Sequence, residues 1–286
     1  MAPTIASKVG KFVGPYAQRA DTLSLHLSRV LQTSAGIDTT LCTVCYTLTL
    51  LHSQLTRVLA QRYEKLAFGA ISKSLASPGE TLLASLSAPS TRLAATCASV
   101  KALADLISDF RIFFRLWGLV TIYAWGRETY TTPPRDPVVK ILLWAQIGAS
   151  ATFQVLENAA YLAVKGVLRG EKWERRQTRW DALSNRWWMA QVVLELLRLA
   201  RVRQMQFNEE FGAQTVGEGE KEVKVQSQEL ERKWWNEVYL NAGWLPLTLH
   251  WSFEDPAHSP VSETWIGICG MLAGVSGFRK VWEETA

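Results

Sequence analysis

Hydrophobic residues recur at every third or fourth position along most of this 286-residue chain, which is the spacing of helices that bury one face. Alternation with a period of two, which would indicate strands, is scarce. The pattern therefore predicts an all-α protein. Proline- and glycine-containing segments separate the expected helices, which cover residues 15–31, 38–71, 92–125, 137–168 and 173–207.

The C-terminal third changes character twice. Residues 207–237 hold eight acidic against four basic residues, which is typical of a solvated acidic linker. Uncharged stretches follow at 239–253 and 264–278. Each would form about 22 Å of helix, whereas a bilayer core is about 30 Å thick, so each crosses only with help from its flanks. Lys and Arg at the two outer ends predict a short transmembrane hairpin with both ends in the cytosol.

These features divide the chain into regions. We expect an N-terminal cytosolic helical region at 1–90 and amphipathic, membrane-associated helices at 91–206. The acidic linker follows at 207–237, and the membrane hairpin occupies 238–286.

The segment 141–164 is long enough to cross a membrane but carries a polar stripe. At 100° per residue its polar side chains fall within about a third of the helix circumference. A charge at the centre of a membrane helix costs about 2.5–3.5 kcal/mol on insertion scales. This helix therefore needs a partner, or a protonated Glu157. The central members of the stripe are Gln154, Glu157, Asn158 and Tyr161.

The segment 101–117 has an aromatic face and a charged face. Such a helix can lie in the headgroup plane, with its aromatic face buried and its cations on anionic lipid. Core-facing helices of soluble proteins show the same periodicity, so both interpretations stay open. The expected membrane-binding residues are Lys101, Leu106, Ile107, Phe110, Arg111, Phe113, Phe114, Arg115 and Trp117.

Gly270 and Gly274 have the four-residue spacing of a close helix contact within an apolar segment. We expect them to pack helices together and to close the C-terminal hairpin.

The composition favours a membrane protein and indicates no catalytic or metal site. Tryptophan, of which there are 13, favours the boundary between lipid and water, and residues 1–135 hold 14 basic against 7 acidic residues, which suits an anionic leaflet. The sequence has no basic run interleaved with aromatic residues, which is the pattern that would indicate nucleic-acid binding. The pair Cys42 and Cys45 has no second cysteine pair nearby. We predict no catalytic site, metal, cofactor or small-molecule substrate.

Four segments, in their order and spacing, resemble the peroxin-eleven family, and most closely its fungal C-type branch. They are FRIFFRLWG at 110–118, FQVLENAAYL at 153–162, SNRWW at 184–188, and residues 270–282. The resemblance covers roughly residues 90–286. Arg111, Phe113, Phe114 and Arg115 fall on the family's basic amphipathic element. Ile112 stands where a basic residue is usual, and Asp105 and Asp109 weaken attraction to anionic lipid.

The resemblance implies a peroxisomal membrane protein that inserts an amphipathic helix, elongates the organelle and helps recruit fission machinery. It also implies termini in the cytosol and self-association into a homo-oligomer. Two alternatives stay open. The polar stripe around Glu157 could line a pore or transport path, and every stripe could instead be the core of a soluble helical scaffold.

Overall fold

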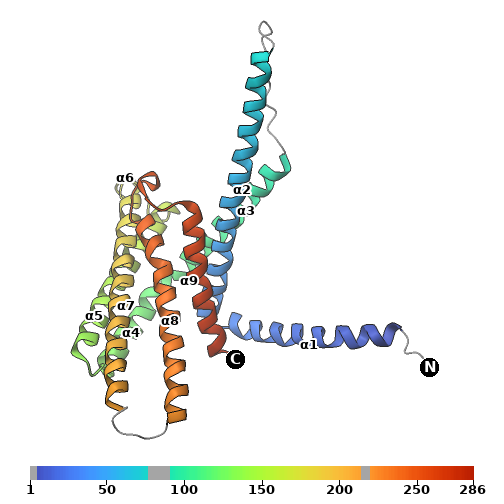
Figure 1. Cartoon of the computed structure of the whole chain (residues 1–286). Helices are drawn as coiled ribbons and strands as arrows, with labels where there is room; N and C mark the ends of the chain where they lie inside the picture. Colours follow the sequence, from blue (N-terminus) through green and yellow to red (C-terminus); the bar gives the residue numbers. More distant parts are fainter. Residues whose placement is uncertain (1–4, 77–90, 214–219) are drawn as a thin grey trace.

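The computed structural model describes residues 5–76, 91–213 and 220–286, and within these ranges it contains helices and short connections but no strand (Figure 1). The all-α prediction is confirmed. The helices are α1 (Ile5–Leu31), α2 (Ser34–Ala76), α3 (Thr91–Phe114), the 3-10 helix η1 (Arg115–Trp117), α4 (Gly118–Thr131), α5 (Pro137–Val164), α6 (Glu171–Glu174), α7 (Gln177–Ala213), α8 (Glu220–Trp251), the 3-10 helix η2 (Pro256–His258) and α9 (Glu263–Glu284).

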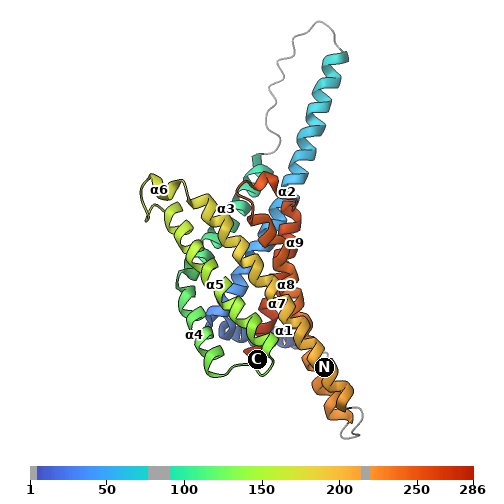
Figure 2. The ribbon, with the colours of Figure 1, turned by 90° about the vertical axis from the view of Figure 1, so that its left-hand side faces the viewer.

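The long helices pack side by side in the order α2, α9, α8, α7 and α5. α3 packs along α2 and then crosses toward α5, and α4 packs on α5 (Figure 2). The second half of α2 extends beyond the bundle, and α1 leaves the other end across the direction of α8 and α9 (Figure 1).

The helix expected at 92–125 is interrupted by η1. The Leu116 carbonyl oxygen accepts a hydrogen bond from Asn158 Nδ2 of α5 at 2.9 Å. Gly118 follows, and a Cβ atom there would collide with the side chain of Gln154. The close approach of α5 therefore coincides with the break between α3 and α4, and a side chain at position 118 would require the Gln154 side chain to move.

Most of the segment expected to be an acidic linker is helical. Residues 207–213 end α7 and α8 begins at Glu220, while 214–219 lie outside the described residues. Trp234 anchors this part of α8, because its Nε1 donates to the Leu199 carbonyl of α7 at 2.9 Å and Arg203 lies over its ring. Acidic composition indicates solvation, but Glu and Lys are also good helix formers.

α8 and α9 run antiparallel and pack on each other (Figure 1). The two helices approach closely at Gly243 of α8, where an added Cβ would lie 2.7 Å from the Cys269 carbonyl oxygen and 2.9 Å from the Ala273 nitrogen. Gly270 and Gly274 instead face α2: an added Cβ would meet the Tyr46 ring at position 270 and would lie 2.9 Å from Thr43 Cα at position 274. These two glycines thus pack α9 against α2 and do not close the hairpin.

Among the described helices, α5 is the one that is long and apolar enough to cross a membrane, judged by length and composition. Membrane crossing by α8 and α9 is not shown and stays a prediction.

We predict that Gly274→Ala destabilises the fold by about 1–3 kcal/mol, because the added methyl group meets the backbone of α2, which cannot move aside cheaply. The measurement is the thermal unfolding midpoint in detergent. Gly69→Ala is the matched control, since nothing lies within 4 Å of a Cβ there. It should be neutral or slightly stabilising. Equal effects of the two substitutions would contradict the packing role.

Candidate functional site

Arg111 of α3 and Arg115 of η1 point into the bundle. Arg111 is 5% exposed, and its Nε and Nη2 atoms donate to the two carboxylate oxygens of Asp38 of α2 at 2.8 and 3.3 Å. A bidentate arginine–carboxylate pair is strong and directional. Arg111 is therefore neutralised between two helices and does not face solvent.

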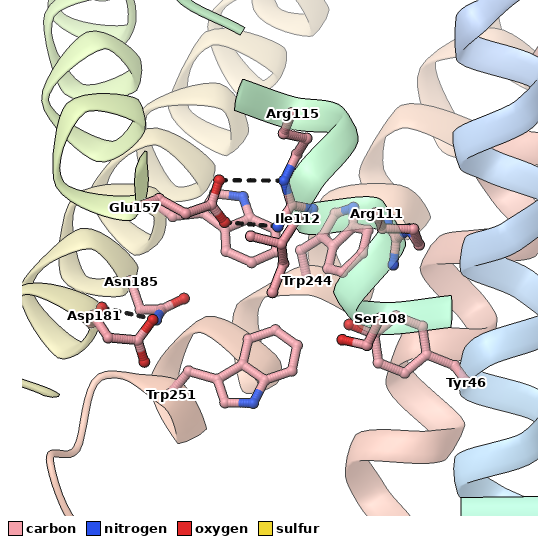
Figure 3. Close-up of a pocket in the computed structure, with 11 residues that line it drawn as sticks. Tyr46, Ser108, Arg111, Ile112, Arg115, Glu157, Asp181, Asn185, Trp244 and Trp251 are labelled. Atoms are coloured by element: carbon pink, nitrogen blue, oxygen red, sulfur yellow. Dashed lines mark hydrogen bonds and ion pairs between the residues drawn. The ribbon is translucent and has the colours of Figure 1, made fainter. Parts of the chain in front are cut away.

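Arg115 follows the same pattern one turn later. Its Nη2 and Nε atoms donate to the Glu157 carboxylate of α5 at 2.6 and 3.3 Å (Figure 3). Gln154 Nε2 also donates to Glu157 at 3.3 Å and to Asn158 at 2.7 Å. The Glu157 side chain is about 10% exposed, so these contacts replace the water that it loses on burial.

The polar stripe of α5 is thus covered by α3. Besides Glu157 and Asn158, its member Tyr161 bonds the Asp109 carboxylate, which Lys165 also contacts at 2.5 Å. The charged face of α3 and the polar stripe of α5 are complementary, which supplies the partner that the stripe needs.

The opposite side of α3 is apolar and exposed. Phe113 is 47% exposed, Trp117 60% and Leu106 65%. Phe110 and Phe114 stack with ring centroids 6.1 Å apart, and Phe113 contacts Trp117 edge to face. We call this surface, which continues onto Trp117 of η1, the outer face of α3; its exposed members are Leu103, Leu106, Phe110, Phe113 and Trp117.

A cavity of about 190 Å³ lies behind α3 and is lined from α2, α3, α5, α7 and α8. Figure 3 shows Arg115 and Glu157 on one side of it and Trp251 across from them. Its polar lining is Tyr46, Ser108, Arg111, Arg115, Glu157, Asp181 and Asn185. The interior is therefore polar where the outer face of the same helix is apolar.

Asp181 is an acid in this lining without an arginine partner. Burial of its carboxyl group and the nearby charge of Glu157 raise the pKa of Asp181 to about 6. The residue as a whole is exposed, so solvent screens part of this effect.

The expected membrane-binding residues separate into three groups. Leu106, Phe110, Phe113 and Trp117 are exposed on the outer face, whereas Ile107 and Phe114 are half-buried. Lys101 is exposed and pairs with Asp105 at 2.9 Å. Arg111 and Arg115 point away from the outer face. Membrane binding itself stays a prediction.

Sequence reasoning missed the acidic partners outside α3. Asp38 lies 73 residues before Arg111, and no periodicity links the two positions. Gln146, two turns before Gln154 on α5, is 1% exposed and donates to Glu195 of α7 at 2.9 Å. The polar face of α5 therefore contacts two neighbouring elements of the bundle, which a helical wheel of α5 alone cannot reveal.

In the described part of the chain, no group of three or more His, Cys, Asp or Glu side chains has the arrangement of a metal site. Burial raises the pKa of the Cys42 thiol to about 11, so it stays protonated and unreactive at neutral pH.

Comparison with known proteins gives one family match. The family model described as peroxisomal biogenesis factor 11 (PEX11) matches residues 81–282. No curated protein and no solved structure matches the chain. The match includes α3, α5 and the residues that line the cavity except Tyr46, because it begins after α1 and α2.

We predict that Arg115 and Glu157 couple by about 1–3 kcal/mol, because removing one partner leaves a desolvated charge on the other. A double-mutant cycle of Arg115→Met and Glu157→Gln, read as unfolding free energy, measures this. The exposed pair Lys101 and Asp105 of α3 is the control and should couple by about 0.5 kcal/mol or less. Equal coupling in both cycles would contradict the burial argument.

We predict a pH dependence that originates at Asp181. Because its folded-state pKa lies above the ordinary value, its protonated form favours folding at low pH, and this contribution is lost as pH rises through about 6. Asp181→Asn should therefore gain in melting temperature relative to the unsubstituted protein between pH 4 and pH 7. A difference that is constant over this range would contradict the assignment.

Proposed function

Because the chain belongs to the family of peroxisomal biogenesis factor 11 (PEX11), we propose that it elongates the peroxisomal membrane by inserting the outer face of α3 into one leaflet. Membership gives a general role in peroxisome proliferation and association with the peroxisomal membrane. It also agrees with the expectation of a protein that is not an enzyme. The leaflet insertion, the curvature and the fission step are the proposal.

One observation carries it: α3 exposes an aromatic and aliphatic face while Arg111 and Arg115 form ion pairs on the inner side. Leaving such a face in water is costly, because burying one large apolar side chain is worth about 1.5–3 kcal/mol. Apolar side chains also continue beyond η1 into α4, where Val120 is 69% and Tyr123 73% exposed. Inserting this surface into one leaflet expands that leaflet and bends the bilayer.

The role of the basic residues changes accordingly. In the arrangement described here, Arg111 and Arg115 hold α3 against α2 and α5, so attraction to anionic lipid falls to other cations. Insertion of α3 then depends chiefly on its apolar contacts.

The proposal places α5 across the membrane, with its polar stripe turned toward α3 and α7. Ile141, Trp144 and Val155 are exposed on α5 and would meet lipid.

Self-association, recruitment of fission machinery, termini in the cytosol and entry of α8 and α9 into the bilayer belong to the same proposal. The fungal C-type branch stays a prediction.

We predict that Phe110→Asp combined with Phe113→Asp lowers binding to anionic vesicles by about tenfold or more and abolishes their tubulation by the full-length protein. Co-sedimentation and electron microscopy measure the two effects. In cells, peroxisomes should stay short while the protein still reaches them.

Leu230→Asp is the matched control. Leu230 is 46% exposed, close to the value for Phe113, but lies in the acidic part of α8. Tubulation that persists in the double variant, or is lost equally in the control, contradicts the proposal.

Release of the protein by alkaline carbonate would instead favour the soluble scaffold. Conductance through reconstituted protein that changes with Glu157→Gln would favour the pore.

A further inference from the structure

α1 is a second amphipathic helix, and it stands apart from the bundle. Its contact with α9 lies near its C-terminal end, where His26 Nε2 donates to the Trp282 carbonyl at 3.1 Å and the two rings lie 3.7 Å apart. Figure 1 shows the rest of α1 running away from the other helices. Most of its surface therefore has no partner among the described residues.

The apolar residues of α1 form one narrow stripe. At 100° per residue they fall within about a third of the circumference. The exposed members include Tyr16 at 63% and Leu23 at 57%, whereas Val30 is completely buried. We call this set the α1 stripe; in the part of α1 with described side chains it comprises Tyr16, Ala20, Leu23, Leu27, Val30 and Leu31. The same spacing continues toward the N-terminus of the sequence at Ile5, Val9 and Phe12.

Outside the stripe the surface of α1 is polar, and its charge is predominantly positive. The helix contains Lys8, Lys11, Arg19 and Arg29 against a single acid, Asp21. Leu25 is the one large apolar residue on this side, and it is 61% exposed. A narrow apolar stripe beside basic residues suits the boundary of an anionic bilayer, where cations meet headgroups and apolar side chains meet acyl chains.

We propose that α1 binds along the surface of an anionic membrane through the α1 stripe, independently of α3. With 27 residues it would cover about 40 Å of that surface. Its direction supports this assignment: α1 runs across the direction of α8 and α9 (Figure 1), so a bundle that stands across the bilayer holds α1 parallel to the surface. Only this orientation argument rests on the proposed function. The family match begins at residue 81, so α1 is an addition to the matched region.

Hydrogen–deuterium exchange of the full-length protein tests the proposal. The protein is reconstituted into phosphatidylcholine vesicles with and without about 30% phosphatidylserine. We expect the backbone amides of residues 16–28 to exchange about tenfold or more slowly on the anionic vesicles, because an unpartnered helix frays until it docks. Tyr16→Asp combined with Leu23→Asp should abolish this protection.

Leu25→Asp is the matched control, because it introduces the same charge at an equally exposed site on the opposite side of the helix. It should retain protection. Loss of protection in both variants, equal protection on neutral vesicles, or no protection on either overturns the proposal. Protection that rises with protein concentration in detergent alone also overturns it and indicates a second copy of the chain as the partner.

The two membrane contacts are separable in the same experiment. Phe110→Asp with Phe113→Asp should leave α1 protected on anionic vesicles even though tubulation is lost. Protection of α1 that disappears with the α3 substitutions would show that α1 has no membrane contact of its own, and would overturn this inference while leaving the role of α3 intact.

Discussion

The ion pair between Arg115 and Glu157 is the contact on which the middle of the molecule depends. Each charge would be costly in the interior alone, so the two must meet, and their meeting fixes how α3 lies on α5. Once Arg115 points inward, helical geometry turns Phe113 and Trp117 outward. One electrostatic requirement thus decides which face of α3 is available for membrane contact.

Polar side chains are buried and large apolar side chains are exposed throughout much of this bundle. Gln146 is 1% exposed and Thr248 is completely buried, whereas Trp265 of α9 is 59% exposed. In water this distribution would be unfavourable, whereas hydrocarbon around the bundle, as proposed above, would reverse the preference for the exposed residues. The cavity bounded by Arg115, Glu157 and the tryptophans then lies within a polar interior.

Composition alone could not tell which tryptophans pack inside the bundle and which lie exposed on its outside. Trp188 lies inside the bundle, with ring centroids 5.0 Å from Trp244 and 5.9 Å from Trp251. Trp117 and Trp265 are exposed on the outside, as expected for residues at a membrane boundary. The same residue type therefore packs the core at some positions and is free to meet lipid at others.

The sequence by itself determined the all-α class, the approximate positions of α2, α5 and α7 and the family, because periodicity, helix breakers and local motifs are properties of neighbouring residues. It also located the stripe around Glu157 and the aromatic face around Phe113. Only the tertiary structure decided that Arg111 pairs with Asp38, that Gly274 packs on α2, and that Arg115 occupies the stripe. These contacts join residues far apart in the chain, and periodicity says which residues share a face but not what that face meets.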